Sequence, residues 1–423
     1  MRQTSILEVN EFLVLDFVRA RGETSRPEIA DELGLSASSI SRIIRRLIVG
    51  GLVTEGSRTS TGGRPRTAIA FNSRAGCVLG VDLGGSKCHG AVADLAGTIV
   101  DEVVRPTARD GGPYPTLVGV IDELVAIATM NGLPVAAIAV GAPAIIDADT
   151  GVATGGPNVD WHGFPLVAEL GRHVNAPLIV QNDVRLAALA HAWRGDGRRC
   201  SDFAVLSIGT GIGAAIVVDG RLARGRHNAA GEVGYLVLAR DQLGQQADER
   251  VDQRAAAALG GFERLAAGPS IAASAAERFA AERFAADGSG RLPEASALTT
   301  AGVFAAAAGG DPIALAVIDE VVDHVAMAIV AIGAIADPEI VILEGSVGRA
   351  LGPFLKRLTE RVASQLPAPP RVVASGLGSN ATVVGAVAAA LQLARTRGAP
   401  VELSSAFTVT GGAAPRRTTA DVA

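Results

Sequence analysis

The first 50 residues carry apolar side chains at the spacing of short amphipathic helices. An apolar residue at every third or fourth position predicts a first helix over residues 9–21. Ser25 and Glu28 have the spacing of a capping box, so a second, short helix should begin after Ser25 and end at Gly34. Ser36 is then placed to cap a third helix.

The third helix has two different faces. Its buried stripe follows the i, i+3, i+4, i+7 pattern and consists of Ile40, Ile43, Ile44 and Leu47. Hydroxyls and guanidiniums occupy the opposite face and its flanks, at Ser38, Ser39, Arg42, Arg45 and Arg46. Such groups suit the base edges and phosphates of a major groove, so these five residues are predicted DNA contacts.

The segment after the third helix is predicted to be a β-hairpin over residues 52–72. At its tip two glycines precede Arg64 and Arg66, whose guanidiniums can enter a narrow minor groove. Three helices followed by a basic hairpin are typical of a winged helix-turn-helix, and we predict this DNA-binding domain over residues 1–72. The alternative is a small helical domain whose arginines form a solvated face.

The rest of the chain alternates apolar strands with helices. Residues 78–94 and 203–219 share the pattern strand, glycine-rich turn, strand, which indicates a duplicated lobe. Helices are expected over residues 115–130, 183–195, 269–285, 311–336, 347–365 and 382–396. This alternation predicts an α/β architecture with a cleft between two lobes, residues 73–182 and 183–398. Residues 399–423 are expected to be a flexible tail.

Composition narrows the class of protein. Of the 423 residues 48% are hydrophobic, enough for large cores, and with a net charge of −5 any nucleic-acid contact must come from a local basic patch. Cys77, Cys88 and Cys200 lack metal-type or disulfide-type spacing, as in proteins of a reducing compartment. The longest apolar run, residues 325–336, is too short to span a bilayer, and the N-terminus has no signal-peptide pattern. We therefore expect a cytoplasmic protein with no membrane partner.

Two glycine-rich turns are candidate phosphate sites. The first contains Asp82, Gly84, Gly85, Ser86 and Lys87, and the second contains Gly209, Thr210 and Gly211. The glycines let backbone amides approach phosphate oxygens, while Ser86 and Lys87 add a hydroxyl and a charge. The alternative for each turn is an ordinary tight hairpin.

Asn182 and Asp183 follow an apolar strand and begin a helix. The carboxyl end of a strand is where open α/β sheets bind their ligands. Asp183 could accept the proton of a substrate hydroxyl, and Asn182 could hydrogen-bond a neighbouring hydroxyl. The alternative for either residue is a helix N-cap.

Together these motifs resemble the ROK family, which contains bacterial sugar kinases and sugar-responsive repressors, and the resemblance covers nearly the whole chain. Regulators of this family carry a winged helix-turn-helix ahead of a two-lobed actin/hexokinase-like (ribonuclease H-like) domain. The resemblance implies that Asp183 is the catalytic base of a kinase and that the turn from Asp82 to Lys87 is the first phosphate motif. It also implies a homodimer or a higher homo-oligomer.

The same resemblance implies a sugar site. Asn158 lies in a segment, residues 156–161, that is similar to one whose Asn touches sugar hydroxyls. Glu232 lies in a segment similar to the family signature, whose Glu bonds the sugar. Asn182, Asp183 and Tyr235 complete the predicted site, and such amides and carboxylates suit a polyol because each hydroxyl both donates and accepts.

Several positions depart from the family pattern. Tyr235 stands where the family usually has a zinc-binding His, and residues 236–258 contain neither Cys nor His, so no zinc is expected. Gly345 would contact the adenosine of ATP, but the family kinases are richer in glycine there, and Glu344 would place a negative charge near the nucleotide. Ala144 stands where kinases often carry Gly. These departures weaken the expectation of an ATP site.

Three functions follow as hypotheses. The first is a DNA-binding transcriptional regulator, a repressor by family resemblance, that needs no cofactor to bind a double-stranded operator and responds to a sugar or sugar phosphate in the cleft. The second is a sugar kinase, alone or combined with regulation, that uses Mg-ATP with Asp183 as the general base. The third is a structural DNA-binding protein with an inactive actin-like domain, which the retained sugar residues argue against.

Overall fold

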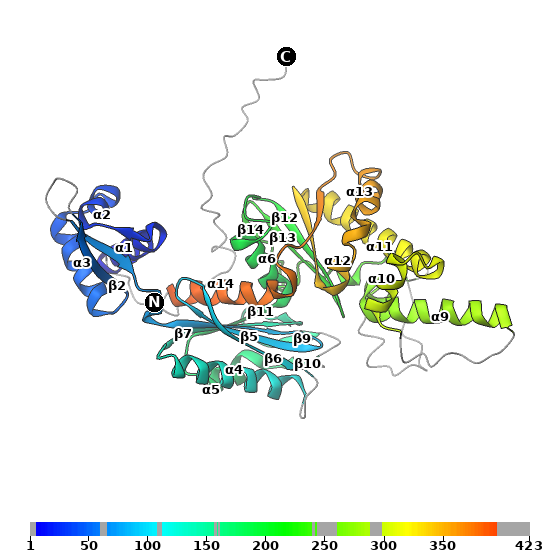
Figure 1. The fold of residues 1–423 in the computed structure, drawn as a ribbon, viewed down its shortest axis with the longest axis horizontal. Helices are drawn as coiled ribbons and strands as arrows, with labels where there is room; N and C mark the ends of the chain where they lie inside the picture. Colours follow the sequence, from blue (N-terminus) through cyan, green and yellow to red (C-terminus); the bar gives the residue numbers. More distant parts are fainter. Residues whose placement is uncertain are drawn as a thin grey trace, which may run out of the picture.

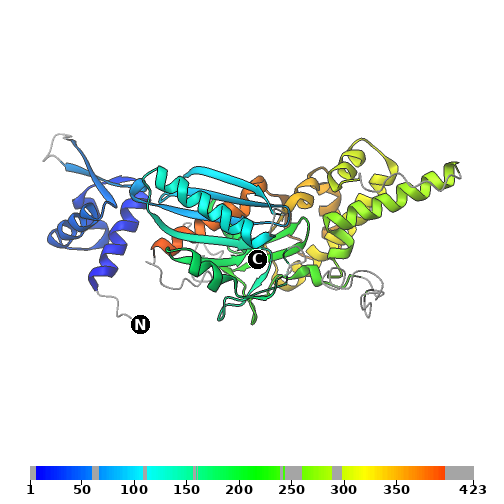
Figure 2. The same cartoon turned by 90° about the horizontal axis from the view of Figure 1, so that it is seen from below.

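The computed structural model describes residues 6–59, 66–107, 112–155, 159, 161–238, 242, 260–287 and 298–395. An N-terminal domain lies at one end of the molecule, and two sheets with their helices form the rest (Figure 1). After a quarter turn the molecule is still elongated, with the N-terminal helices at one end and α9 (Gly268–Asp287) at the other (Figure 2). Among the described residues no helix combines the length and hydropathy needed to cross a membrane.

The N-terminal domain is the predicted winged helix-turn-helix. Its elements are α1 (Ile6–Arg21), β1 (Glu23–Thr24), α2 (Arg26–Leu33), α3 (Ala37–Val49), β2 (Val53–Thr59) and β3 (Arg66–Phe71), and its antiparallel sheet has the order β1-β3-β2. The four apolar residues of the predicted α3 stripe are buried against Val14, Val18 and Ile29. The hairpin tip with Arg64 lies outside the described residues, and nothing is described of the Arg66 side chain.

Local signals in the sequence explain where these helices begin and end. The backbone N–H of Ser25 donates to Glu28 Oε2 at 3.1 Å, as in a capping box. Gly34 ends α2 in the left-handed region, with φ of +62°. The backbone N–H of Ser39 donates to Ser36 Oγ at 3.2 Å, so Ser36 caps α3. The starts of α2 and α3 and the end of α2 match their predictions.

Two five-stranded sheets repeat the same topology. The first lobe contains β4 (Cys77–Leu83), β5 (Lys87–Asp94), β6 (Ile99–Pro106), α4 (Pro113–Met130), β7 (Val135–Ala142), α5 (Leu166–His173) and β11 (Leu178–Asn182), with the small strands β8 (Ile145–Ile146), β9 (Ala153–Gly155) and β10 (Trp161–Phe164). Its sheet has the order β11-β7-β4-β5-β6. Strands β4, β5 and β6 pair antiparallel, whereas β4, β7 and β11 pair parallel.

The second sheet has the order β14-β13-β12-β15-β16. Its strands are β12 (Phe203–Ile208), β13 (Ile212–Val218), β14 (Arg221–Leu222), β15 (Ile340–Glu344) and β16 (Arg371–Ala374). Antiparallel pairs join β12, β13 and β14, and parallel pairs join β12, β15 and β16, as in the first sheet. The repeated pairing confirms the two-lobed α/β fold predicted from the sequence.

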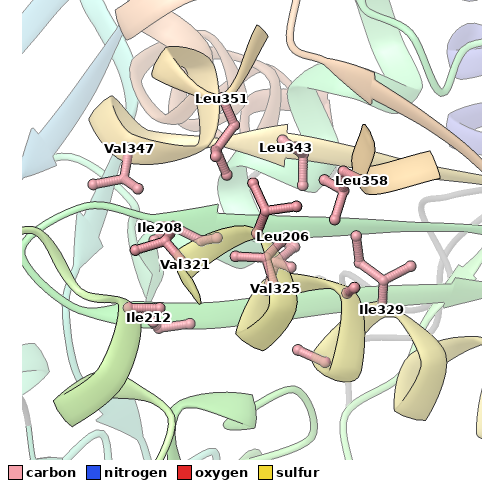
Figure 3. Close-up of a cluster of buried hydrophobic side chains, with 14 of the residues drawn as sticks. Leu206, Ile208, Ile212, Val321, Val325, Ile329, Leu343, Val347, Leu351 and Leu358 are labelled. Atoms are coloured by element: carbon pink, nitrogen blue, oxygen red, sulfur yellow. The ribbon is translucent and has the colours of Figure 1, made fainter. Parts of the chain in front are cut away.

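Helices cover both faces of the second sheet. The helices of this half are α8 (Glu263–Ala266), α9, α10 (Thr300–Ala308), α11 (Pro312–Ala336), α12 (Gly345–Ala350) and α13 (Leu355–Ala363). On the outer face, Leu206 of β12 and Leu343 of β15 pack against Val321 and Val325 of α11 and Leu358 of α13 (Figure 3). Because alternate strand residues face opposite ways, Phe203 and Val205 point to the inner face.

Two helices fill the space between the sheets. These are α6 (Asp183–Arg194) and α14 (Ala381–Arg395), and their buried residues share one core with Val78 of the first sheet and Val205 of the second. Sequence analysis assigned residues 183–398 to the second lobe; in the structure α14, from the end of that range, packs on β4 and β7 of the first. Nη1 of its last residue, Arg395, lies 4.0 Å from Oδ1 of Asp16 in α1.

The predicted helices agree with the structure except in one segment. The single helix expected over residues 347–365 is wrong, because α12 and α13 are separated by a 3-10 turn over Gly352–Phe354. Pro353 explains the break, since proline has no backbone N–H to donate and its ring clashes within a helix. Helices α5 and α10 were not predicted at all.

Glycines set how closely the inner helices approach. A Cβ at Gly385 of α14 would collide with the carbonyl oxygen of Leu186 in α6, and a Cβ at Gly80 of β4 would lie 2.7 Å from the backbone nitrogen of Val387.

Gly385→Ala should therefore lower the free energy of unfolding by about 3 kcal/mol, seen as a lower urea midpoint. Gly119→Ala in α4, where a Cβ meets nothing within 4 Å, should raise it by about 0.5–1 kcal/mol. Equal midpoints for Gly385→Ala and wild type would contradict this close contact.

Candidate functional site

A pocket of about 180 Å³ lies between the two lobes. Pro143 and Ala144, just after β7, and Asn182, at the end of β11, line it from the first lobe. The turn between β12 and β13, together with Glu232 and Glu263, lines it from the second lobe. The pocket is therefore at the carboxyl ends of parallel strands, the place where open α/β sheets bind ligands.

Asn182 is an N-cap. Its Oδ1 accepts the backbone N–H groups of Val184 at 3.0 Å and Arg185 at 3.2 Å, and its Nδ2 donates to the carbonyl of Ala144 at 3.4 Å. The structure thus favours the capping role that sequence analysis left open, although Asn182 also lines the pocket. Its contact with a sugar stays a prediction.

Asp183 is the first residue of α6 and lines the pocket. Its Oδ1 accepts the backbone N–H of Val184 at 2.9 Å. Burial raises the pKa of this carboxyl to about 6, while hydrogen bonds from the backbone act in the opposite direction. A carboxyl that titrates near neutral pH at a cleft is suited to accept a proton from a hydroxyl group.

Two further carboxyls titrate under the influence of Asp183. Burial, then the charges of Asp183 and Glu263, raise the pKa of Glu232 to about 7, and Arg185 lowers it. Burial, then the charge of Asp183, raise the pKa of Asp82 to about 8, and Lys87 lowers it. Glu232 lines the pocket and Asp82 does not. Such perturbed pKa values are typical of functional clefts.

The two predicted phosphate turns differ in how much of each lines the pocket. Gly209, Thr210 and Gly211 line the pocket, as does Gly85. The other predicted members of the nucleotide site, namely Asp82, Gly84, Ser86, Lys87 and Gly345, do not line it.

The first turn is a closed hairpin. The backbone N–H of Gly84 donates to the carbonyl of Lys87 at 2.9 Å, and the hydroxyl of Thr107 donates to the carbonyl of Gly84 at 2.7 Å. These bonds favour the tight-hairpin alternative for most of this turn. Its binding of phosphate stays a prediction.

Glu344 belongs to a buried ionic network. Its Oε1 lies 3.0 Å from Nε2 of the fully buried His191, and its Oε2 accepts from Arg349 Nη1 at 3.1 Å. Its carboxylate is thus turned toward these two partners, and Glu344 is not among the residues that line the pocket. The negative charge expected beside a nucleotide is compensated by Arg349.

The pocket residues that sequence reasoning missed include Arg185, Asn228 and Glu263. The buried Glu263 accepts the backbone N–H of Ile212 at 2.7 Å and that of Gly260 at 3.2 Å, so it holds the end of the second glycine turn. A lone carboxylate between glycines and apolar residues was the available signal. Arg185 offered the same kind of signal, as an arginine beside the apolar run of residues 186–190.

Of the two remaining predicted sugar residues, the structure describes Tyr235 but not Asn158. Tyr235 lines the pocket from a 3-10 turn (Val233–Tyr235) and is 56% exposed. Asn158 lies outside the described residues. Within the described ranges no three His, Cys, Asp or Glu side chains are grouped as for a metal ion, and the expectation of no zinc stays a prediction.

The predicted DNA-binding face of α3 is exposed at Ser38, Arg42, Arg45 and Arg46, and Ser39 is half-buried. Arg46 Nη2 lies 3.2 Å from Glu11 Oε2 of α1, so its guanidinium already has a carboxylate partner. For Arg42 and Arg45 the described part of the chain provides no carboxylate within 4 Å. These two guanidiniums are therefore the best placed to meet phosphates.

The fold and the pocket define a winged helix-turn-helix protein with a two-lobed, sugar-kinase-like domain. The chain belongs to the ROK family, whose model matches residues 78–393. Residues 7–64 match the MarR family.

Relatives of known name include both repressors and kinases. The chain is 29% identical to the xylose repressor of Caldicellulosiruptor bescii over 56% of this chain, and spans 60% of that repressor's length. It is 30% identical to the glucokinase of Halalkalibacterium halodurans over 73% of this chain and 92% of that enzyme. A similar solved structure is the crystal structure of a ROK family transcriptional regulator, a homologue of the Escherichia coli Mlc protein. It matches 96% of this chain and all of its own with a TM-score of 0.70 and 24% identity, so the two proteins share a fold.

The raised pKa of Asp183 predicts a dependence of stability on pH. Because the pKa is about 6 in the folded protein and near 4 when unfolded, stability falls as the pH rises from about 4 to about 6. Asp183→Asn removes that loss, so at pH 8 the ligand-free variant should melt a few degrees above wild type, and the gap should shrink toward pH 5. Asp149→Asn, at an exposed position, should leave the melting temperature unchanged at both pH values. A variant that melts below wild type at pH 8 would refute the prediction.

Proposed function

We propose that this chain is a cytoplasmic transcriptional repressor whose affinity for an operator is set by a sugar bound in the interlobe pocket. The observation that carries the proposal is the presence in one chain of an exposed α3 face, with two guanidiniums that have no carboxylate partner among the described residues, and a polar pocket between two lobes. The similarity to a xylose repressor supports it. A winged helix-turn-helix on an enzyme alone would have no role.

A continuous set of contacts leads from the pocket to the DNA-binding domain. Helix α6 begins in the pocket at Asp183 and packs closely on α14, which ends beside Asp16 of α1. Helix α1 packs on α3 and is tied to it by the ion pair between Glu11 and Arg46. A sugar that binds two lobe arrangements with different affinity would therefore also bias the position of α3. In a homodimer, which we also propose, that shift changes the spacing of two recognition helices.

Sugar kinase activity is the second candidate. The pKa of Asp183, near 6, suits a general base, and Gly209, Thr210 and Gly211 could hold the phosphates of Mg-ATP, the donor of the phosphoryl group. The similarity to a glucokinase favours it as well. The Asp183→Asn variant distinguishes the repressor from the kinase. It should abolish phosphorylation and still permit a sugar to alter DNA binding.

A thermal-shift screen of monosaccharides with and without Mg-ATP tests the proposed function. At concentrations well above its dissociation constant, a bound sugar should raise the melting temperature, with no need for nucleotide. Each stabilising sugar should then change operator affinity without ATP turnover. Phosphorylation of a sugar that leaves DNA binding unchanged would favour the kinase, and a screen with no stabilising sugar would favour a structural DNA-binding protein.

Arg42 and Arg45, the exposed arginines of α3 with no carboxylate partner in the described part of the chain, predict a specific salt dependence. Arg42→Ala should weaken operator binding about tenfold and, because a phosphate contact is lost, reduce the slope of log K against log salt by about 1. Fluorescence anisotropy with an operator isolated by selection measures both quantities. Arg357→Ala, on the exposed face of α13, should bind as wild type does. If Arg42→Ala matched that control, α3 would not be the DNA-binding element.

A further inference from the structure

The wall of the pocket contains a buried arginine with few partners. Arg185 is only 3% exposed, and it lines the pocket from the first turn of α6. Its Nε is buried and has no hydrogen-bond acceptor among the described residues. One Nη donates to the backbone carbonyl of Asn228, but at 3.5 Å, which is long for a hydrogen bond.

The charge of Arg185 is not neutralised by an adjacent carboxylate. Within the part of the chain that the structure describes, no Asp or Glu oxygen lies within 4 Å of this guanidinium. Burial and then the charge of Arg224 lower its pKa to about 10, and the charge of Glu232 opposes them, so Arg185 is still a cation at neutral pH. Burying a cation without a counter-charge is costly, and such groups are rare unless something else pairs with them.

A second unsatisfied group lies in the same pocket. Nδ2 of Asn228 donates to the carbonyl of Ile146 at 2.7 Å, which leaves Oδ1 buried and without a donor. Asn228 also has a φ of +59°, in the left-handed region that few residues other than glycine adopt. A cation with a single long hydrogen bond and an oxygen that lacks a donor among the described residues, both facing one cavity, indicate a ligand with an anionic group and a hydroxyl or amide.

The acidic groups of the pocket leave room for such a ligand. The carboxylate of Glu263 is already bound to two backbone N–H groups. Asp183 and Glu232, with pKa values of about 6 and about 7, are protonated for part of the time near neutral pH. A volume of about 180 Å³ is below the roughly 300 Å³ typical of sites for drug-sized ligands, which favours a small ligand such as one sugar.

We propose that Arg185 determines ligand specificity: its guanidinium binds an anionic substituent, a carboxylate or a phosphate, so that the pocket selects an acidic monosaccharide over its neutral parent. The planar fork of a guanidinium matches both oxyanions. This inference rests on the proposed function, since it takes the ligand to be a sugar.

Isothermal titration of the full-length protein tests the inference. The probes are glucose, galactose, mannose and N-acetylglucosamine, each with its 6-carboxylate and its 6-phosphate, which distinguishes the two sources of charge. In at least one series an acidic sugar should bind at least tenfold more tightly than its parent. Neutral sugars that bind as well as or better than their acidic counterparts would overturn the inference and leave the proposed function intact. Absence of binding in every series would overturn both.

Variants separate a role in recognition from a role in structure. Arg185→Met should reduce affinity for the acidic sugar at least tenfold and change affinity for the neutral parent less than threefold, whereas equal losses for both would contradict the inference. Because Arg185 has no carboxylate partner, the ligand-free variant should melt at or above the wild-type temperature, and a clearly lower temperature would indicate a structural role. Arg221→Met, at an exposed position of β14, is the matched control and should bind both sugars as wild type does. The wild-type comparison alone decides the matter if Arg185→Met does not fold.

Discussion

The layer formed by α6 and α14 is the physical constraint on which the rest of the molecule depends. Both helices lie between two sheets, so most side chains on them must fit a core that is closed on both faces. Gly385 and Gly80 permit the approach, because a methyl group at either position would meet backbone atoms. Tight packing of this kind allows rigid shifts of whole elements rather than gradual deformation.

Residues of this layer determine the chemistry of the pocket. Because α6 starts at the carboxyl end of β11, its first turn brings Asp183 and Arg185 to the cleft, and Asn182 caps the same turn. The burial that makes the layer a core also raises the pKa of Asp183 and holds Arg185 where no described carboxylate lies within 4 Å. Stability and ligand recognition are therefore set by the same few residues, and improving one should cost the other.

The parts of this account that the sequence could predict are those with local causes. The caps at Ser25 and Ser36 and the stripe of α3 depend on neighbours a few positions away, and the duplicated strand pattern showed two lobes. Asp183 was identified from its place at the end of an apolar strand and then by family resemblance, and Glu232 by family resemblance alone. The break of the predicted helix at Pro353 also had a local cause, and the helical periodicity on either side obscured it.

The parts that could not be predicted depend on contacts between distant segments. Nothing near Glu263 in the sequence indicates that it binds the N–H of Ile212, 51 positions away. The position of α14 across the first sheet and the isolation of Arg185 likewise follow from how the lobes close together. Lys87 shows the converse: its motif was clear in the sequence, but the hairpin keeps it out of the residues that line the pocket.

The central claim is that occupancy of the pocket and occupancy of the DNA-binding face are linked. The most direct measurement compares two ratios, both in the absence of ATP. The first is the dissociation constant of the effector sugar without saturating operator DNA over the value with it. The second is the dissociation constant of the operator without saturating sugar over the value with it. Linkage requires the two ratios to be equal, and the account predicts a factor of about 5 or more in both. If both ligands bind and neither dissociation constant changes, the pocket does not regulate DNA binding and the account is wrong.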